Sequence, residues 1–200
     1  YYALKQRANL KSGETLLVLG SSGGVGLTAV ELGKLLGAKV IAAASSDEKL
    51  EFVKQLKPDY LLNYNDCDLK ETVKDLTGGR GADVIYDPVG GDLFDQCCRC
   101  INWNGRLLVI GFTSGRISSY KANLALLKGS SMVGVFLGRF RKEEPEAYEK
   151  NFKELLNMYR EGNLNPIVTK SFALEDFVDA FNIFSQRKAM GKVTLELKQE

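Results

Sequence analysis

A glycine-rich segment, GSSGGVG at residues 20–26, lies between two apolar stretches with different periodicities. Before it, residues 15–19 (TLLVL) form a short continuous apolar run, which is typical of a strand buried on both faces. After it, apolar residues recur at helical spacing from Val25 to Leu36, and Gly37 follows where a helix would stop. The sequence therefore predicts a strand, a glycine loop and a helix, in that order.

This succession is the context in which a glycine loop binds a dinucleotide. Glycines let backbone amides approach a diphosphate, and the start of the helix supplies unpaired N–H groups and a partial positive charge. The spacing departs from the usual pattern, because Ser21 stands where the first glycine is expected. We predict a dinucleotide site, with a purely structural turn as the alternative, and expect these loop residues to contact the coenzyme: Ser22, Gly23, Gly24 and Val25.

The end of the next apolar run (KVIAAA) bears on which dinucleotide is bound. NAD-specific sites usually place a carboxylate there, which would repel a 2′-phosphate. Here the run leads into Ser45 and Ser46, and we expect the first acidic residues, Asp47 and Glu48, to cap and begin the next helix. Lys49 lies one turn into that helix. Two hydroxyls and a cation favour NADPH, while the alternative for the lysine is an ordinary solvated side chain.

Further strands and helices alternate along the chain, which predicts a doubly wound parallel sheet of the Rossmann α/β class. Turn-forming residues gather between Gly162 and Pro166, so we place a boundary there, with an NADP-binding domain at 1–162 and a C-terminal helix and strand at 163–200. We expect further strands at 39–44, 60–63, 83–87, 106–110, 131–137 and 192–197, and further helices at 47–56, 68–76, 91–101, 143–160 and 175–186.

Charge and cysteine content argue against several other classes. The formal net charge is +2 with both signs interspersed, so we expect neither nucleic-acid nor membrane-surface binding. No apolar run approaches the roughly 18 residues that a membrane helix needs. The chain has no histidine, and we expect its four cysteines to be reduced thiols without a metal. Such thiols are typical of the cell interior; we expect the cytoplasm, and the sequence leaves mitochondria open.

Several sequence strings, in the same order, resemble the quinone oxidoreductase branch of the medium-chain dehydrogenase/reductase superfamily, the branch that includes zeta-crystallin. The resemblance runs through almost the whole chain and implies an NADPH-binding domain. The parent enzyme would transfer hydride from NADPH to a quinone or another α,β-unsaturated carbonyl compound, without zinc. The strings are GETLLVLGSSGGVG (13–26), the pair Asn63 and Tyr64, DVIYDPVGG (83–91), GRLLVIGFTSG (105–115), VGVFLG (133–138) and GKVTL (191–195).

The resemblance also implies how the site is divided. The 2′-phosphate would be surrounded by Ser45, Ser46, Lys49 and Tyr64, the path to the nicotinamide lined by Val89, Gly111, Phe112 and Thr113, and the nicotinamide ring flanked by Phe136, Leu137 and Gly138, with Lys192 approaching from the C-terminal end. From residue type alone, Phe112 and Phe136 are interpreted equally well as core aromatics. We assign no catalytic residue, because solvent or another part of the enzyme could supply the proton.

The resemblance further implies a larger enzyme. Its members carry a preceding barrel-like domain to which nothing here corresponds, so we expect this chain to be the coenzyme-binding part. Residues 1–10 resemble the helix that leaves that domain, and the stretch after Gly162 resembles the segment that returns to it. The run 131–137 could pair across a two-fold axis in a homodimer or lie inside the sheet. Two other functions stay open: a zinc-dependent alcohol dehydrogenase of the same superfamily, and a non-catalytic NADPH-binding protein.

Overall fold

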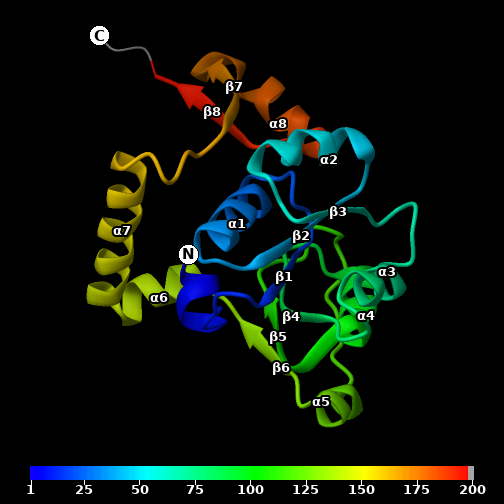
Figure 1. Cartoon of the computed structure of the whole chain (residues 1–200). Helices are drawn as coiled ribbons and strands as arrows, with labels where there is room; N and C mark the ends of the chain where they lie inside the picture. The colour runs from blue at the N-terminus through cyan, green and yellow to red at the C-terminus, as the bar shows by residue number, and fades with distance from the viewer. Residues whose placement is uncertain (198–200) are drawn as a thin grey trace.

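The computed structural model describes residues 1–197, in which a six-stranded parallel sheet carries helices on both faces (Figure 1). The strand order is β3-β2-β1-β4-β5-β6, and each neighbouring pair is parallel. The chain therefore builds outward from β1 to β3 and then returns to the other side of β1 with β4. This order confirms the predicted doubly wound Rossmann class.

The elements have the following bounds. The strands of the large sheet are β1 (Thr15–Val18), β2 (Lys39–Ala44), β3 (Tyr60–Asn63), β4 (Ala82–Asp87), β5 (Ile101–Val109) and β6 (Ser131–Gly134). The helices are η1 (Ala3–Arg7), α1 (Gly24–Leu35), α2 (Asp47–Val53), η2 (Lys54–Leu56), α3 (Leu69–Leu76), α4 (Gly91–Cys100), α5 (Ala122–Lys128), α6 (Leu137–Glu143) and α7 (Pro145–Arg160). A small parallel sheet pairs β7 (Val168–Ala173) with β8 (Lys192–Glu196), and η3 (Leu174–Asp176) and α8 (Phe177–Ser185) lie between them along the chain.

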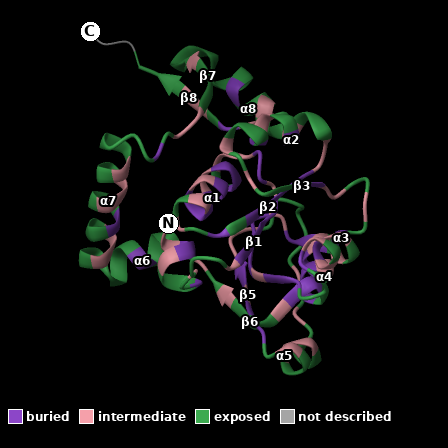
Figure 2. Ribbon diagram, viewed as in Figure 1, coloured by how far each residue is buried: buried purple, intermediate pink, exposed green. Residues whose placement is uncertain are grey.

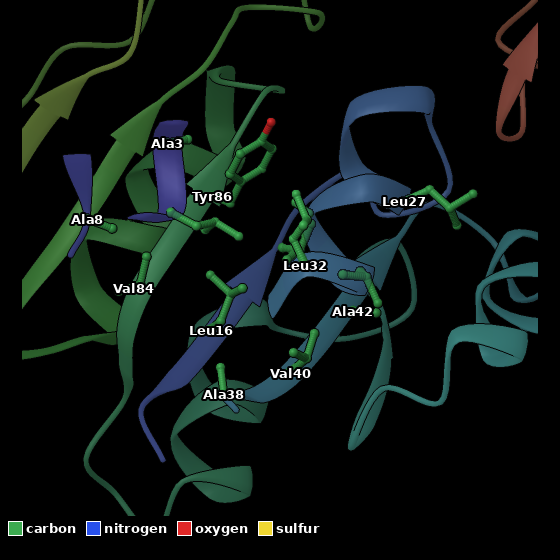
Figure 3. Close-up of a cluster of buried hydrophobic side chains, with 14 of the residues drawn as sticks. Ala3, Ala8, Leu16, Leu27, Leu32, Ala38, Val40, Ala42, Val84 and Tyr86 are labelled. Atoms are coloured by element: carbon green, nitrogen blue, oxygen red, sulfur yellow. The ribbon is translucent and has the colours of Figure 1, made fainter. Parts of the chain in front are cut away.

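Apolar side chains on the two faces of the large sheet form two separate cores. On one face, Leu16 and Val40 pack with residues of η1 and α1 (Figure 3). On the other face, Leu17 and Ile41 pack with residues of α3 and α4. Because successive side chains of a strand point to opposite faces, the residues of β1 and β2 after the first must be apolar to serve both cores. This requirement explains the continuous apolar runs in the sequence.

The region after β5 differs from the sequence prediction. The strand predicted at 131–137 ends at Gly134, because Phe136 is already the N-cap of α6 and its carbonyl accepts from Phe140 N at 3.1 Å. The helix predicted at 143–160 begins at Pro145 as α7. Proline has no N–H to continue a preceding helix and is favoured in the first turn, so α6 and α7 are separate.

Other differences follow from exposure. Helix α5 and strand β7 were not predicted, and neither contains a buried residue, so neither has an apolar period in its sequence. Val25 and Leu35, which belong to the apolar pattern of α1, are 53% and 43% exposed and lie outside its buried face. The central strands are buried, whereas α7, α8 and the small sheet are largely exposed (Figure 2). Within residues 1–197, no helix is long and apolar enough to cross a membrane.

Candidate functional site

The carboxyl ends of β1 and β4 flank the point at which the strand order reverses. Loops that leave the strands on either side of such a point diverge and open a crevice, which is where ligands bind in this fold class. Strand β1 leads into the glycine loop, residues 20–26, and β4 leads into residues 88–90. A Cβ on Gly20 would lie 3.3 Å from Val89 Cγ2. The structure therefore places the predicted site residue Val89 beside the glycine loop.

The glycine loop is tight because its backbone folds onto itself. Gly23 N donates to the carbonyl of Gly20 at 3.0 Å, and Gly20 has a φ of +57°. A Cβ on Gly26 would lie 2.1 Å from that carbonyl oxygen, so only glycine fits there. Helix α1 begins at Gly24 with no side-chain cap and no acidic residue in its first turn. Its first N–H groups are therefore suited to an anionic ligand.

Ser21, which stands in place of the first expected glycine, is fully buried. Its N–H donates to the carbonyl of Ala43 at 3.0 Å, which fixes the loop to β2. Among residues 1–197, its Oγ is the buried side-chain polar atom without a hydrogen-bond partner. An unpaired buried hydroxyl costs free energy and is typical of a place that a bound water or ligand completes.

Three predicted 2′-phosphate residues, Ser45, Lys49 and Tyr64, meet at the end of β2; we call them the β2-tip cluster. Lys49 Nζ donates to Ser45 Oγ at 2.9 Å. Burial raises the pKa of Tyr64, and a side-chain hydrogen bond with Ser45 opposes that shift. Within the described part of the chain, no carboxylate is hydrogen-bonded to these three side chains. The cluster therefore offers hydroxyls and a cation to an anion.

Ser46, the fourth residue predicted for the 2′-phosphate, is engaged elsewhere. Its Oγ accepts from Lys49 N at 3.4 Å and caps α2. Asp47 and Glu48, which were expected to provide the cap, instead occupy the first turn, where their charges favour the helix dipole. The Asp47 carboxylate accepts from Asn63 Nδ2 at 3.0 Å. The prediction about the cap was therefore wrong by one or two residues, and the hydroxyl of Ser46 has a structural partner.

Arg187, which the sequence analysis did not single out, also lies near the β2-tip cluster. Burial raises the pKa of Tyr64, whereas the positive charge of Arg187 lowers it, so the guanidinium is close to the phenol. Arg187 has a φ of +57° in the turn after α8, where glycine is usual. A side chain kept at such a position is a signal of function. The signals in the sequence that could have indicated a basic turn here are the adjacent Lys188 and the nearby Gly191.

Two loops on the other side of the crevice are joined by hydrogen bonds. The buried Asp87 accepts through Oδ1 from Val89 N and Gly90 N, each at 2.8 Å. Burial raises the pKa of Asp87, and these two hydrogen bonds act in the opposite direction. Thr113 N donates to the carbonyl of Pro88 at 3.1 Å. The predicted residues Val89 and Thr113 therefore belong to one connected unit.

The remaining residues predicted near the nicotinamide lie on the same edge of the sheet. A Cβ on Gly111 would lie 3.4 Å from the carbonyl of Pro88, so the loop after β5 lies against the turn after β4. Phe112 is 42% exposed and Phe136 is 71% exposed, so both are surface aromatics and their interpretation as core residues was wrong. Phe136, Leu137 and Gly138 follow β6 and lie one strand further out than the loop after β5.

The C-terminal unit, residues 168–196, contacts the glycine loop. Gly191 N donates to the carbonyl of Ser22 at 2.8 Å, and Gly23 and Gly191 form an isolated parallel bridge. A Cβ on Gly24 would lie 3.4 Å from the carbonyl of Gly191 and 3.9 Å from Lys192 Cγ. Lys192 is therefore next to the start of α1, on the side from which it was expected to approach.

The chain is similar to one known protein family and to several known proteins. A family described as zinc-binding dehydrogenase matches residues 24–156. The chain is 40% identical over 201 residues to a quinone oxidoreductase-like protein 2 homolog of Nematostella vectensis, covering 100% of this chain and 55% of that protein. It is 40% identical over 198 residues to quinone oxidoreductase-like protein 2 of Bos taurus, covering 98% and 57%.

Solved structures give the same result. A quinone oxidoreductase of Escherichia coli, complexed with NADPH, has a TM-score of 0.89 at 26% identity and is covered over 61% of its length by 98% of this chain. A quinone oxidoreductase of Pseudomonas syringae has a TM-score of 0.89 at 28% identity, with 98% of this chain covering 60% of it. The chain therefore spans little more than half the length of these four proteins.

Proposed function

The chain belongs to the zinc-binding dehydrogenase family, and we propose that it is the NADPH-binding domain of an oxidoreductase. Its relatives are quinone oxidoreductase-like proteins, in agreement with the strings that predicted that branch of the medium-chain dehydrogenase/reductase superfamily. The parent enzyme transfers hydride from NADPH to a quinone or another α,β-unsaturated carbonyl compound. The observation that carries the coenzyme proposal is the β2-tip cluster, a cation and hydroxyls where an NAD-specific site has a carboxylate.

The residues present fit this coenzyme. Bound NADPH supplies the hydride, and the chain supplies orientation and charge. The first N–H groups of α1 hold the diphosphate beside Ser22, Gly23, Gly24 and Val25, and the unpaired Ser21 hydroxyl marks the same loop as a place that a ligand completes. Lys49 and Ser45 receive the 2′-phosphate together with Tyr64, and Arg187 adds a second cation.

The nicotinamide half is held by backbone geometry. Asp87 fixes the turn that carries Val89, and Thr113 joins that turn to the loop with Gly111 and Phe112. Phe136, Leu137 and Gly138 follow β6 and extend the carboxyl edge of the sheet to its outermost strand on that side. We assign no proton donor to a side chain of this domain, since hydride transfer to a carbonyl compound can take its proton from solvent or from another domain.

Zinc, which the family description names, does not fit the described residues. Residues 1–197 contain no group of three His, Cys, Asp or Glu side chains arranged to hold a metal. Cys97, Cys98 and Cys100 are buried, and burial raises the pKa of Cys98 to about 12, whereas a metal binds the thiolate. The described residues therefore offer no site for zinc. One equivalent of tightly bound zinc in the full-length enzyme would instead support the alcohol dehydrogenase alternative.

The parts outside the crevice support two further proposals. The division at residue 162 separates the coenzyme-binding domain from a return segment, residues 163–200, whose helix α8 exposes Phe177, Phe181 and Phe184 to a preceding domain. Strand β6 is at an edge of the sheet rather than inside it, so a homodimer can form by pairing β6 with its two-fold copy. Light scattering of the full-length protein tests the dimer.

The decisive experiment is a titration with NADPH and NADH side by side. Lys49→Ala removes a cation and a charge-assisted hydrogen bond, which are worth roughly 10-fold to 100-fold in affinity. We expect NADPH to lose at least about 10-fold and NADH less than about 2-fold, because only NADPH has the 2′-phosphate. Lys54→Ala, which removes an exposed lysine paired with Glu51, is the matched control and leaves both affinities unchanged. Equal losses for the two coenzymes contradict the proposal, and turnover of a quinone by the full-length enzyme excludes a non-catalytic role.

A further inference from the structure

A hollow of about 360 Å³ lies between α2 and the C-terminal unit, beside the β2-tip cluster; we call it the basic hollow. Figure 1 shows α2 next to α8 and the small sheet at this place. The volume equals about twelve water molecules at roughly 30 Å³ each, which is ample for a phosphoryl group. The hollow is lined by Glu48, Lys49, Thr169, Lys170, Ile183, Arg187, Lys188, Met190 and Val193.

The charges of the basic hollow are strongly unbalanced. Four cationic residues line it, Lys49, Lys170, Arg187 and Lys188, against the single carboxylate of Glu48. Within residues 1–197, the side chains of Lys170, Arg187 and Lys188 form no hydrogen bond or ion pair. Convergent unpaired cations in a concave surface focus a positive potential and attract anions.

Elsewhere on the surface, several cations are paired with carboxylates. Ion pairs join Lys34 to Asp59 at 2.7 Å and Arg116 to Asp92 at 2.7 Å. Lys54 pairs with a glutamate on the same stretch of chain. The basic hollow differs from these places because four cations line one concave surface against a single carboxylate, and like charges held together without a bonded counter-ion cost free energy that a bound anion would recover.

The coenzyme uses only part of this set. Lys49 belongs to the β2-tip cluster through its contact with Ser45, Arg187 lies near that cluster, and both also line the basic hollow. Lys170 lies on β7 and Lys188 in the turn before β8; both line the hollow, and neither is hydrogen-bonded to Ser45 or Tyr64. Two cations are thus shared between the two places, and two belong to the basic hollow alone.

We propose that the basic hollow is a second anion subsite, which binds a phosphoryl group that does not belong to the coenzyme. Lys170 and Lys188 are its own ligands, and Lys49 and Arg187 are shared with the neighbouring pocket. The inference rests on the proposed function for that pocket and extends to regulation. An anion in the hollow engages the shared cations and lowers the affinity for NADPH, and bound NADPH lowers the affinity for the anion by the same factor. NADH, which lacks the 2′-phosphate, is affected much less.

The test uses inorganic phosphate as the probe, titrated by calorimetry and ³¹P NMR at constant ionic strength with chloride as the balancing anion. We expect the domain to bind phosphate and the double variant Lys170→Ala/Lys188→Ala to bind it at least about 5-fold more weakly. Phosphate should raise the apparent Kd of NADPH for the unmodified domain and not for the double variant. Without phosphate, the two should bind NADPH within about 2-fold. The control Lys142→Ala/Lys153→Ala removes the same charge from α6 and α7 and should behave as the unmodified domain.

The outcomes separate the two proposals. Phosphate binding that is equal in the unmodified domain and the double variant places the anion elsewhere and overturns the subsite. An effect of phosphate on NADPH that chloride reproduces at the same ionic strength is general screening and also overturns it. If phosphate binds through Lys170 and Lys188 while NADPH does not bind at all, the subsite stands and the proposed function fails. If NADPH binds and phosphate does not, the proposed function stands alone.

Discussion

The two ends of the parallel sheet are made from the same strands but from different interactions. At the amino end, charged groups are paired: Arg106 Nη1 and Nη2 donate to Glu14 Oε1 and Oε2 at 2.8 and 2.7 Å, and Arg106 Nε donates to the carbonyl of Ala8. At the carboxyl end, the glycine loop leaves helix amides uncapped, and the cations of the basic hollow have no carboxylate partner within residues 1–197. The amino end therefore stabilises the fold, and the carboxyl end keeps groups available for ligands.

The largest effect is expected for Gly26→Ala, because here the carboxyl end also matters for stability. The added Cβ would lie 2.1 Å from the carbonyl oxygen of Gly20 and 2.9 Å from Ser21 Cα, so the backbone must move. We expect a loss of about 3 kcal/mol in the free energy of unfolding, measured by urea denaturation, together with loss of NADPH binding. The matched control is Gly24→Ala, whose Cβ would have its nearest neighbour at 3.4 Å and should cost less than about 1 kcal/mol in stability. Equal stability of the two variants would show that the loop is not tight.

A smaller effect is expected at the amino end for Arg106→Ala. The variant loses a bidentate, charge-assisted ion pair with the partly buried Glu14. We expect the free energy of unfolding to fall by about 2 kcal/mol, with unchanged affinity for NADPH. Arg116→Ala removes a pair with a fully solvated Asp92 and should cost less than about 0.5 kcal/mol. A change in NADPH affinity for Arg106→Ala would break the distinction between the two ends.

The same ion pair has a defined pH dependence. Burial raises the pKa of Glu14, but the hydrogen bonds from Arg106 and Lys11 outweigh it, and the pKa in the folded state is below its ordinary value of 4.5. A carboxyl with a depressed folded pKa stabilises the fold above its unfolded pKa and loses this contribution as the pH falls through the folded value. The stability advantage of the unmodified domain over Arg106→Ala should therefore be constant above pH 5 and shrink in acid below 4.5. Urea denaturation across this range measures the difference.

The smallest effect concerns two neighbouring serines and sharpens the description of the carboxyl end. Ser46 caps α2 through a long hydrogen bond of 3.4 Å, so Ser46→Ala should cost about 0.5 kcal/mol in stability and change NADPH affinity less than about 2-fold. Ser45→Ala removes the hydroxyl that Lys49 contacts, and we expect NADPH to weaken by roughly 5-fold, about the value of one hydrogen bond. Calorimetry with NADPH and thermal denaturation separate the two serines; a reversed order would restore Ser46 as the phosphate ligand.

The features that could be predicted from sequence are those with local causes. The glycine loop, β1 and α1 follow from glycine positions and apolar periods within one stretch of chain. The approach of Arg187 to Tyr64 could not be predicted, because packing of α8 and the turn after it brings the two together across most of the chain. Strand β7 has no buried residue and hence no pattern, and its place is set by its partner β8. That Ser46 caps α2 rather than Asp47 or Glu48 is a difference of one or two residues, below the precision of a periodicity argument.

The contact between Gly191 and Ser22 makes the last strand a neighbour of the first loop. Ser22 belongs to the glycine loop and is also hydrogen-bonded to the C-terminal unit, so a change in either one affects the other. We therefore expect a bound dinucleotide to make residues 168–196 more rigid, and detachment of these residues to loosen the glycine loop. The backbone order of residues 168–196 would then report whether the coenzyme is bound.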